Sequence, residues 1–191
     1  MQNKRLLSLD ILRGLTIILM IIVNDPGSWS NVYAPLLHAE WNGITPTDYI
    51  FPCFLFIVGV SIVLSMKKQY ESGKSRNELM KKVLWRALKI YAVGIFLWVW
   101  PNFNFEGIRW VGVLPRIAFV YLACALLFLY ASRKTQWYFG ISVILGYWLV
   151  MAYIPIPGIG FPDLNVPEKN WAHFIDHLIL PGRLWQETWD P

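Results

Sequence analysis

Long apolar runs alternate with short polar segments along the 191 residues of the chain. Five of these runs have about 18–20 residues each, which is enough for a helix to cross roughly 30 Å of hydrocarbon. They cover residues 6–23, 49–66, 83–100, 111–130 and 137–154. Because every backbone amide needs an internal partner in lipid, the pattern predicts helices and not strands. We therefore expect an all-α, polytopic membrane helix bundle with five transmembrane helices, forming a single transmembrane domain over residues 1–191.

The composition supports a membrane protein and excludes several other classes. Hydrophobic residues make up 56% of the chain and charged residues only 15%, against about 25% charged in soluble domains. That balance excludes a disordered chain, a collagen-like chain and a charged coiled coil. The two cysteines, Cys53 and Cys124, are too few for a disulfide framework or a zinc site, so no metal is expected.

The positive charges lie mostly on one side of the predicted topology. The loop 24–47 contains no lysine or arginine, whereas thirteen of the 17 basic residues fall at the other ends of the runs. These thirteen are Lys4, Arg5, Arg13, Lys67, Lys68, Lys74, Arg76, Lys81, Lys82, Arg86, Lys89, Arg133 and Lys134. The asymmetry predicts a cytoplasmic N-terminus and an external loop 24–47, in a multi-pass protein of the bacterial inner-membrane type. The net charge of +5 thus reflects membrane orientation and does not indicate nucleic-acid binding.

Three polar side chains interrupt or end the first apolar run. At 100° per residue, Asp10, Arg13 and Asn24 fall in one stripe about 60° wide. Asp10 and Arg13 are i,i+3 neighbours and can pair. One interpretation is an ion pair near the cytoplasmic surface, with Arg13 extending to the interface. The other is a polar stripe that faces a binding site, since charges inside a membrane usually mark one.

The predicted external loop holds a histidine ahead of a helix-start signal. Thr45 suits an N-cap, Pro46 the first helical position, and Asp48 the third position of a capping box. His38 is not explained by capping, and imidazole is the side chain suited to act as a base at neutral pH. Asp48 has a second candidate role, which is to orient that imidazole.

Arg116 interrupts the fourth apolar run about one turn from its outer end. Two interpretations stand. Arg116 pairs with Asp48 or Glu106, or it contacts a cofactor or a sugar.

These residues belong to longer patterns that resemble the heparan-α-glucosaminide N-acetyltransferase family. The resemblance rests first on Asp10-x-x-Arg13-Gly14 followed by Asn24, and on the block His38-Ala39-x-Trp41-Asn42-Gly43-x-Thr45-x-x-Asp48-x-x-Phe51-Pro52-x-Phe54-x-Phe56-Ile57-x-Gly59-x-Ser61. Further matches are Pro101-Asn102-Phe103, Gly112-Val113-Leu114-x-Arg116, Ile154-Pro155-x-Pro157-Gly158 and Ile175-Asp176. The resemblance covers nearly all of the chain.

The resemblance implies a transmembrane enzyme that takes acetyl-CoA made in the cytosol and acetylates an amino sugar on the far side of the membrane. The family's active-site histidine matches His38, and an asparagine at the end of its first span matches Asn24. On this basis we expect His38 as the base, Asn24 as a donor to the oxyanion and Asp48 as the group that orients His38. Asp10, Arg13 and Arg116 are the expected contacts to acetyl-CoA. The segment is expected to be the N-terminal part of a longer acyltransferase.

Other classes of function stay open at this point. A non-enzymatic membrane bundle of transporter type, or an inactive truncated relative, fits the same apolar pattern. We expect membrane lipid and a glycan or amino-sugar acceptor as partners. The sequence leaves a homo-oligomer open.

Overall fold

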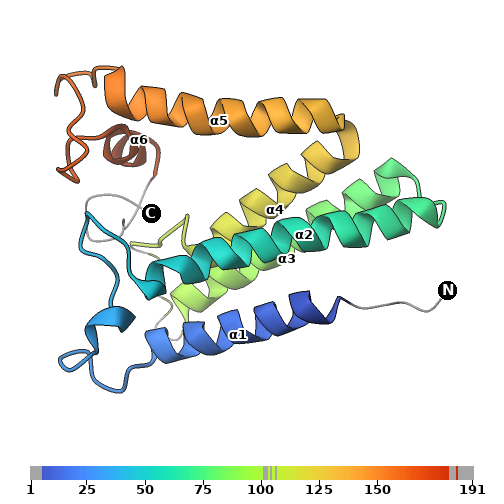
Figure 1. Cartoon of the computed structure of the whole chain (residues 1–191), viewed down its shortest axis with the longest axis horizontal. Coiled ribbons are helices and arrows are strands. Elements are labelled where there is room, and N and C mark those ends of the chain that lie inside the picture. The colour runs from blue at the N-terminus through green and yellow to red at the C-terminus, as the bar shows by residue number, and fades with distance from the viewer. Residues whose placement is uncertain (1–5, 101–102, 104, 106, 181–183, 185–191) are drawn as a thin grey trace. The chain divides into compact units, whose positions relative to one another are not determined.

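The computed structural model describes residues 6–100, 103, 105, 107–180 and 184, and every regular element within these residues is helical. Figure 1 shows a succession of long helices joined by turns and loops. The elements are α1 (Leu7–Asn24), the short 3-10 helices η1 (Ala34–Leu36) and η2 (Pro46–Tyr49), α2 (Ile50–Glu71), α3 (Arg76–Val99), α4 (Val113–Tyr130), α5 (Arg133–Tyr153) and α6 (Trp171–Ile179). The predicted all-α fold is confirmed. The basic residues Lys4, Arg5 and Arg183 lie outside the described residues, as does Glu106.

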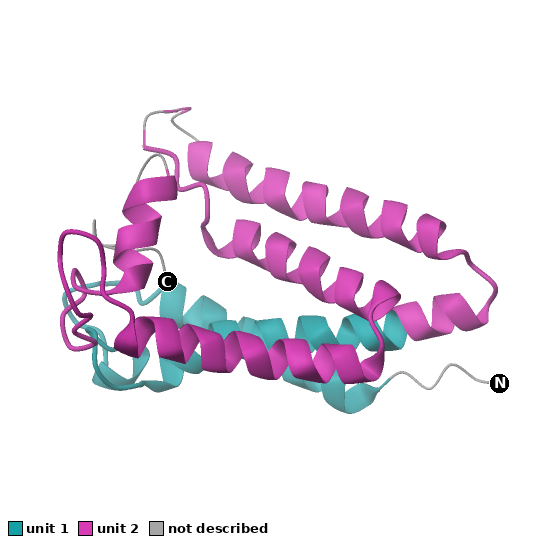
Figure 2. Cartoon of the chain, turned by 90° about the horizontal axis from the view of Figure 1, so that it is seen from above, with its two compact units in different colours: residues 1–65 teal, residues 66–191 magenta. Residues whose placement is uncertain are grey.

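The chain forms two compact units that meet inside α2, at residues Ser65 and Met66. Figure 2 colours them separately. Unit 1 is Met1–Ser65 and holds α1, the loop between α1 and α2, and most of α2. Unit 2 is Met66–Pro191 and holds the last turns of α2 and helices α3 to α6. The expectation of one transmembrane domain over 1–191 stays a prediction.

The prediction of five transmembrane helices is wrong in number. A long helix lies at each of the five apolar runs, but within the described residues only three are long and apolar enough to cross a membrane. These three are Leu7–Asn24, Pro46–Glu71 and Val113–Tyr130. Helix α3 carries Lys82, Arg86 and Lys89 within its last 18 residues, so charge interrupts its apolar part. Helix α5 has no charge after Lys134, but its many tryptophan and tyrosine residues lower its mean hydropathy.

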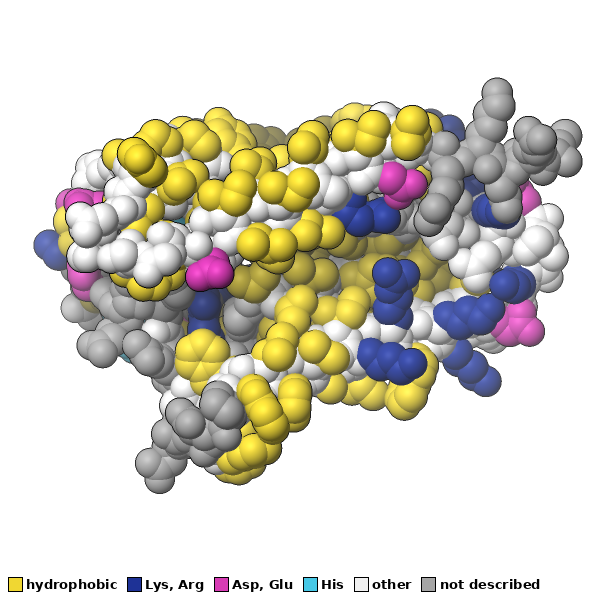
Figure 3. All heavy atoms as spheres, turned by 90° about the horizontal axis from the view of Figure 1, so that it is seen from below, with side chains coloured by type: hydrophobic (Ala, Val, Ile, Leu, Met, Phe, Trp, Pro, Cys, Tyr) yellow, Lys and Arg dark blue, Asp and Glu magenta, His cyan; other side chains and the backbone are white. Residues whose placement is uncertain are grey.

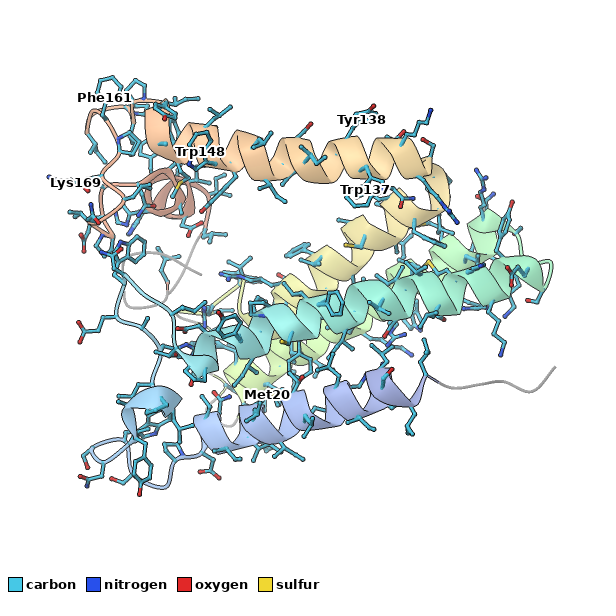
Figure 4. The ribbon with its side chains drawn as sticks, viewed as in Figure 1. Met20, Trp137, Tyr138, Trp148, Phe161 and Lys169 are labelled. Atoms are coloured by element: carbon cyan, nitrogen blue, oxygen red, sulfur yellow. The ribbon has the colours of Figure 1, made fainter. Side chains whose placement is uncertain are left out.

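Apolar side chains face outward along the long helices, as expected of surfaces that contact lipid. On α1, Ile18 and Ile21 are each more than half exposed. None of the residues of α5 is buried, and Trp137 and Tyr138 project from different sides of that helix (Figure 4). This surface is too apolar for a monomer in water, so the structure supports an integral membrane protein.

Helix α6 lies beyond the last of the predicted apolar runs, which ends at residue 154. Trp171–Ile179 forms a helix of nine residues. Asn170 starts it, because the Asn170 side chain is fully buried and accepts a hydrogen bond from the His173 backbone N–H at 2.9 Å. The indole Nε1 of Trp171 donates to the Ile154 carbonyl at 2.7 Å, which ties α6 to the end of α5.

Helices α3 and α4 pack closely in unit 2, and a glycine is required where they meet. A β-carbon built on Gly94 of α3 would lie 2.5 Å from Pro115 Cδ and 2.9 Å from Leu114 Cβ, both on α4. Tyr91 and Phe119 stack edge to face, with ring centroids 5.6 Å apart. The small residue on α3 thus lets the two backbones approach, as in other membrane helix pairs.

We expect Gly94→Ala to destabilise the α3–α4 pair by about 1–3 kcal/mol, because the proline ring is fixed to the backbone and cannot move aside. The control is Gly140→Ala on α5, where nothing lies within 4 Å of the added carbon. That change should be neutral or stabilising by up to about 1 kcal/mol, because alanine favours a helix over glycine. Thermal unfolding in detergent measures both. Equal midpoints for the two variants would contradict the close approach.

Candidate functional site

Asp48 is the acceptor around which the loop between α1 and α2 is arranged. Its Oδ2 accepts hydrogen bonds from the backbone N–H of Thr45 at 2.8 Å and of Ala39 at 3.3 Å. Thr45 is the N-cap of η2, Pro46 is the first residue of that helix, and a capping box joins Thr45 to Asp48. The predicted helix start is confirmed. The same carboxylate therefore begins the helix and fixes the backbone beside His38.

The imidazole of His38 lies against the other oxygen of this carboxylate. His38 Nδ1 is 2.6 Å from Asp48 Oδ1. Because an ionised carboxylate only accepts, Nδ1 carries the proton of this bond and Nε2 keeps its lone pair. The His38 side chain is 60% exposed, whereas that of Asp48 is 24% exposed. The ring is thus held from one side and open on the other, which is the arrangement that a general base requires.

Two further contacts join residues 45–47 to backbone carbonyls of residues 35–37 in the same loop. The Thr45 hydroxyl lies 2.7 Å from the Leu37 carbonyl oxygen and 3.0 Å from Asp48 Oδ2, so its single proton is shared between them. Thr47 is buried, and its hydroxyl donates to the Pro35 carbonyl at 3.3 Å. Both η1 and α1 pack against η2. The loop therefore places His38 by several independent contacts.

Asn24 is the last residue of α1, and its side chain turns back onto that helix. Its Nδ2 donates to the Met20 carbonyl at 2.8 Å, so the amide is bonded within the last turn of the helix. This bond is a structural role that Asn24 can play without any catalysis. No contact in the described part of unit 1 joins the Asn24 amide to His38 or Asp48.

Asp10 and Arg13 form the predicted ion pair, and Arg13 also reaches a second helix. Arg13 Nη1 is 3.2 Å from Asp10 Oδ1, and Arg13 Nη2 donates to the Ser61 hydroxyl of α2 at 3.1 Å. The side chains of Arg13 and Asp10 are 42% and 34% exposed. The pair thus links α1 to α2 and keeps part of the guanidinium accessible.

Ser61 belongs to the family block, but this contact was not predicted from its residue type and position. The sequence contains a signal for this contact, because Ser61 places a hydroxyl in the middle of an apolar run that has no charged residues. A hydroxyl at such a position needs a partner, and the nearest intramembrane cation is the natural one.

Arg116 lies on the first turn of α4 in unit 2, where its backbone N–H bonds the Gly112 carbonyl at 3.0 Å. One of the two carboxylates considered for it, Glu106, lies outside the described residues. The structure defines the surroundings of His38 and of Arg116 separately, each within its own unit.

The geometry defines a class of protein before any comparison. A helical membrane protein carries a histidine–aspartate pair in the loop that joins its first two apolar helices. Such a pair can take up and return a proton. No cluster of three or more His, Cys, Asp or Glu side chains that could hold a metal ion occurs in the described residues.

The comparisons with known proteins agree with this class. The family model "Heparan-alpha-glucosaminide N-acetyltransferase, catalytic" matches residues 5–176. The chain is 35% identical to the human heparan-alpha-glucosaminide N-acetyltransferase, over 81% of this chain and 26% of the human protein. It is 31% identical to the mouse protein of the same name, over 93% of this chain and 32% of that protein.

The chain therefore belongs to the heparan-alpha-glucosaminide N-acetyltransferase catalytic family. It spans about a quarter to a third of the length of the curated relatives that it matches. The match includes both the His38–Asp48 loop and the Asp10–Arg13 pair.

We expect Asp48→Ala to destabilise the folded protein by about 1–2 kcal/mol, because it leaves the Thr45 and Ala39 amides without their acceptor. The matched control is Glu40→Ala, which removes an exposed carboxylate from the same loop. Thermal unfolding of both variants in one detergent provides the measurement. A loss in Glu40→Ala as large as in Asp48→Ala would mean that loop charge, and not the hydrogen bonds, sets the stability.

Proposed function

We propose that this chain carries the reactive residues of a membrane acetyltransferase that moves an acetyl group from cytosolic acetyl-CoA to an amino sugar of glucosamine type on the external side. The observation that carries the proposal is the 2.6 Å contact between His38 Nδ1 and Asp48 Oδ1 in the loop between α1 and α2 of a family member. Membership of the family supports an N-acetyltransferase, and the name shared by the human and mouse relatives supports glucosamine as the acceptor unit.

The proposed chemistry requires a base and a donor. The amine nitrogen of the sugar attacks the thioester carbonyl carbon, the C–S bond breaks, and the CoA sulfur leaves as a thiolate. His38 Nε2 takes the proton that the nitrogen loses on forming the amide. Asp48 stabilises the imidazolium that results, because the two charges are joined by a hydrogen bond. Asp48 thus serves the base and the helix start at once.

Asn24 is the proposed donor to the oxyanion that forms on the carbonyl. Its Nδ2 bonds Met20 in the structure, and an amide nitrogen has a second proton to donate. The Asn24 amide can therefore donate to the oxyanion and keep its bond to the Met20 carbonyl.

The proposed contacts of acetyl-CoA are Arg13, Asp10 and Arg116. Arg13 suits a phosphate or pyrophosphate because a guanidinium has five donors and the Asp10 and Ser61 contacts use two of them. Along α1, Arg13 and Asn24 are separated by about 16 Å of helix, so a long thin donor such as acetyl-CoA fits the spacing. Arg116 is proposed on its family motif alone.

The decisive experiment is acetyl transfer from acetyl-CoA to soluble glucosamine by membranes that contain the whole protein. We expect His38→Ala to lower turnover by about 10²–10⁴-fold at matched amounts of folded protein. Wild-type turnover should also fall on acidification, because a protonated imidazole has no lone pair to accept a proton.

The control is His177→Ala, which removes an exposed imidazole from α6. It should leave turnover unchanged. Retention of more than about a tenth of turnover by His38→Ala would exclude His38 as the base. Absence of transfer by the wild-type protein to any amino sugar would favour a non-enzymatic membrane protein.

The proposed topology has its own test. In a variant without Cys53 and Cys124, a cysteine placed at Ser30 should react with a membrane-impermeant thiol reagent added outside intact cells. A cysteine placed at Ser75 should react only after permeabilisation. The basis is that α2 separates the two positions and that basic residues cluster after α2 and are missing before it. Reversed labelling would place His38 in the cytosol and rule out transfer across the membrane.

A further inference from the structure

Helix α6 of unit 2 separates its polar and apolar side chains onto opposite sides. At 100° per residue, the polar residues His173, Asp176 and His177 fall within an arc of about 100°. The rings of His173 and His177 have centroids 4.2 Å apart, so these two residues share one side of the helix. The opposite side is an apolar face that contains Trp171, Phe174, Ile175, Leu178 and Ile179.

The first turn of α6 is attached to the end of α5. Trp171 begins α6, and the residue that accepts its indole hydrogen bond, Ile154, directly follows α5. The rings of Trp171 and Phe174 pack edge to face, with centroids 5.5 Å apart. Trp148 and Tyr153 pack in the same way near the end of α5, with centroids 5.6 Å apart. Aromatic side chains of this kind are typical of the boundary between headgroups and acyl chains.

The loop that leads into α6 fixes the direction of the helix. The Asp163 backbone N–H donates to the Lys169 carbonyl at 2.8 Å, and Asn170 Nδ2 donates to the Pro167 carbonyl at 2.6 Å. Because Asn170 is also the buried N-cap of α6, the helix is joined both to this loop and to the end of α5. Its apolar face therefore has a defined orientation.

The second half of this apolar face is uncovered within the described residues. Leu178 and Ile179 are 72% and 65% exposed, whereas His173 and Asp176 on the polar side are partly buried. A surface helix in water has the opposite arrangement, because burial of its apolar face stabilises the folded chain. The exposed half of the face thus requires apolar surroundings.

The place and direction of α6 favour the membrane surface. Helix α5 has 21 residues, which extend about 32 Å, close to the roughly 30 Å of hydrocarbon in a bilayer. None of its residues is buried, so its sides suit contact with lipid as far as Ile154. Figure 1 shows α6 almost end-on beside the end of α5, and Figure 2 shows it from the side, running across the long helices of unit 2. One of those helices, α4, is long and apolar enough to cross a membrane, so α6 runs parallel to the membrane plane.

Charge does not explain the attachment of α6 to a membrane. The segment 135–180 contains one basic residue, Lys169, and α6 itself contains no lysine or arginine. Figure 3 shows broad apolar areas on the face that it displays, with most of the Lys and Arg side chains toward one end. Without basic side chains, an amphipathic helix binds a bilayer through the burial of its apolar face.

We propose that α6 lies in the membrane interface, with Ile175, Leu178 and Ile179 among the lipid acyl chains and His177 directed to water. The partner is the surface of a lipid bilayer, because the uncovered half of the face continues the exposed apolar surface of α5, to which α6 is attached. Burial of these side chains holds the structured loop before α6 against the membrane. This inference is independent of the proposed acetyl transfer by the residues of unit 1.

The test measures the accessibility of nitroxide spin labels in the whole protein, reconstituted in bilayers of dioleoyl phosphatidylcholine. Labels are attached singly to Leu178→Cys, Ile179→Cys and the matched control His177→Cys, in a variant without Cys53 and Cys124. Oxygen concentrates among acyl chains, whereas a nickel chelate stays in water. We expect the ratio of oxygen to nickel accessibility to be at least about threefold higher at Leu178 and Ile179 than at His177. The three positions are consecutive, so this contrast reports the side of the helix and not the position of the whole segment.

A second lipid composition tests the nature of the attachment. Replacement of half of the phosphatidylcholine by dioleoyl phosphatidylglycerol should leave the contrast unchanged, because α6 has no basic residue. The three substitutions alter exposed side chains, so each labelled protein should keep the thermal unfolding midpoint of the parent variant.

Three results would overturn the proposal. The first is high nickel accessibility at all three positions, which would place α6 in water. The second is low accessibility to both reagents at Leu178 and Ile179, which would mean that protein, such as a second copy of the chain, covers the face. The third is a contrast that arises only with phosphatidylglycerol, which would identify attraction to anionic headgroups as the cause.

Discussion

The carboxylate of Asp48 bonds the residues of the loop between α1 and α2 on which the proposed chemistry depends. One of its oxygens accepts from the backbone of Thr45 and Ala39, and the other contacts His38 Nδ1 at 2.6 Å. A helix start in a membrane protein must satisfy its open N–H groups, and an acidic residue at the third position does so at low cost. Here the same group also fixes the tautomer and direction of an imidazole. The imidazole is therefore positioned by the carboxylate that also begins η2.

Because Asp48 both begins a helix and contacts His38, an exposed loop can hold the imidazole in a defined position. His38 is 60% exposed, and an exposed ring would ordinarily sample several rotamers. The Asp48 side chain is less exposed, and its other oxygen accepts hydrogen bonds from the backbone of Thr45 and Ala39. Asp48 therefore holds the Nδ1 side of the His38 ring, while Nε2 stays accessible. The Arg13 contact to Ser61 plays a comparable part deeper in unit 1, because it joins α1 to the helix that Asp48 begins.

Charge is divided between the two ends of α2 in a way that suits two kinds of contact. The first end follows a loop without lysine or arginine and presents a histidine–aspartate pair. The other end continues into the segment 67–82, which contains six basic residues. An anionic membrane surface attracts the basic segment after α2, whereas the loop before α2 offers it no lysine or arginine. The loop 24–47 that carries His38 therefore contains no lysine or arginine that could pair with Asp48.

The sequence by itself determined the positions of the five long helices, the helix start at Thr45 and the Asp10–Arg13 pair, because each depends on residues close together in the chain. It also identified the family, through motifs that include His38 and Arg13. It misjudged the number of membrane-spanning helices, since run length alone does not weigh the charges of α3 or the aromatic residues of α5. Only the tertiary structure decided that Arg13 bonds Ser61, that Gly94 meets Pro115, and that Asp48 contacts His38 while it also starts a helix. These contacts join residues 10 to 48 positions apart, and their formation depends on how helices and loops pack, which no local pattern of residues specifies.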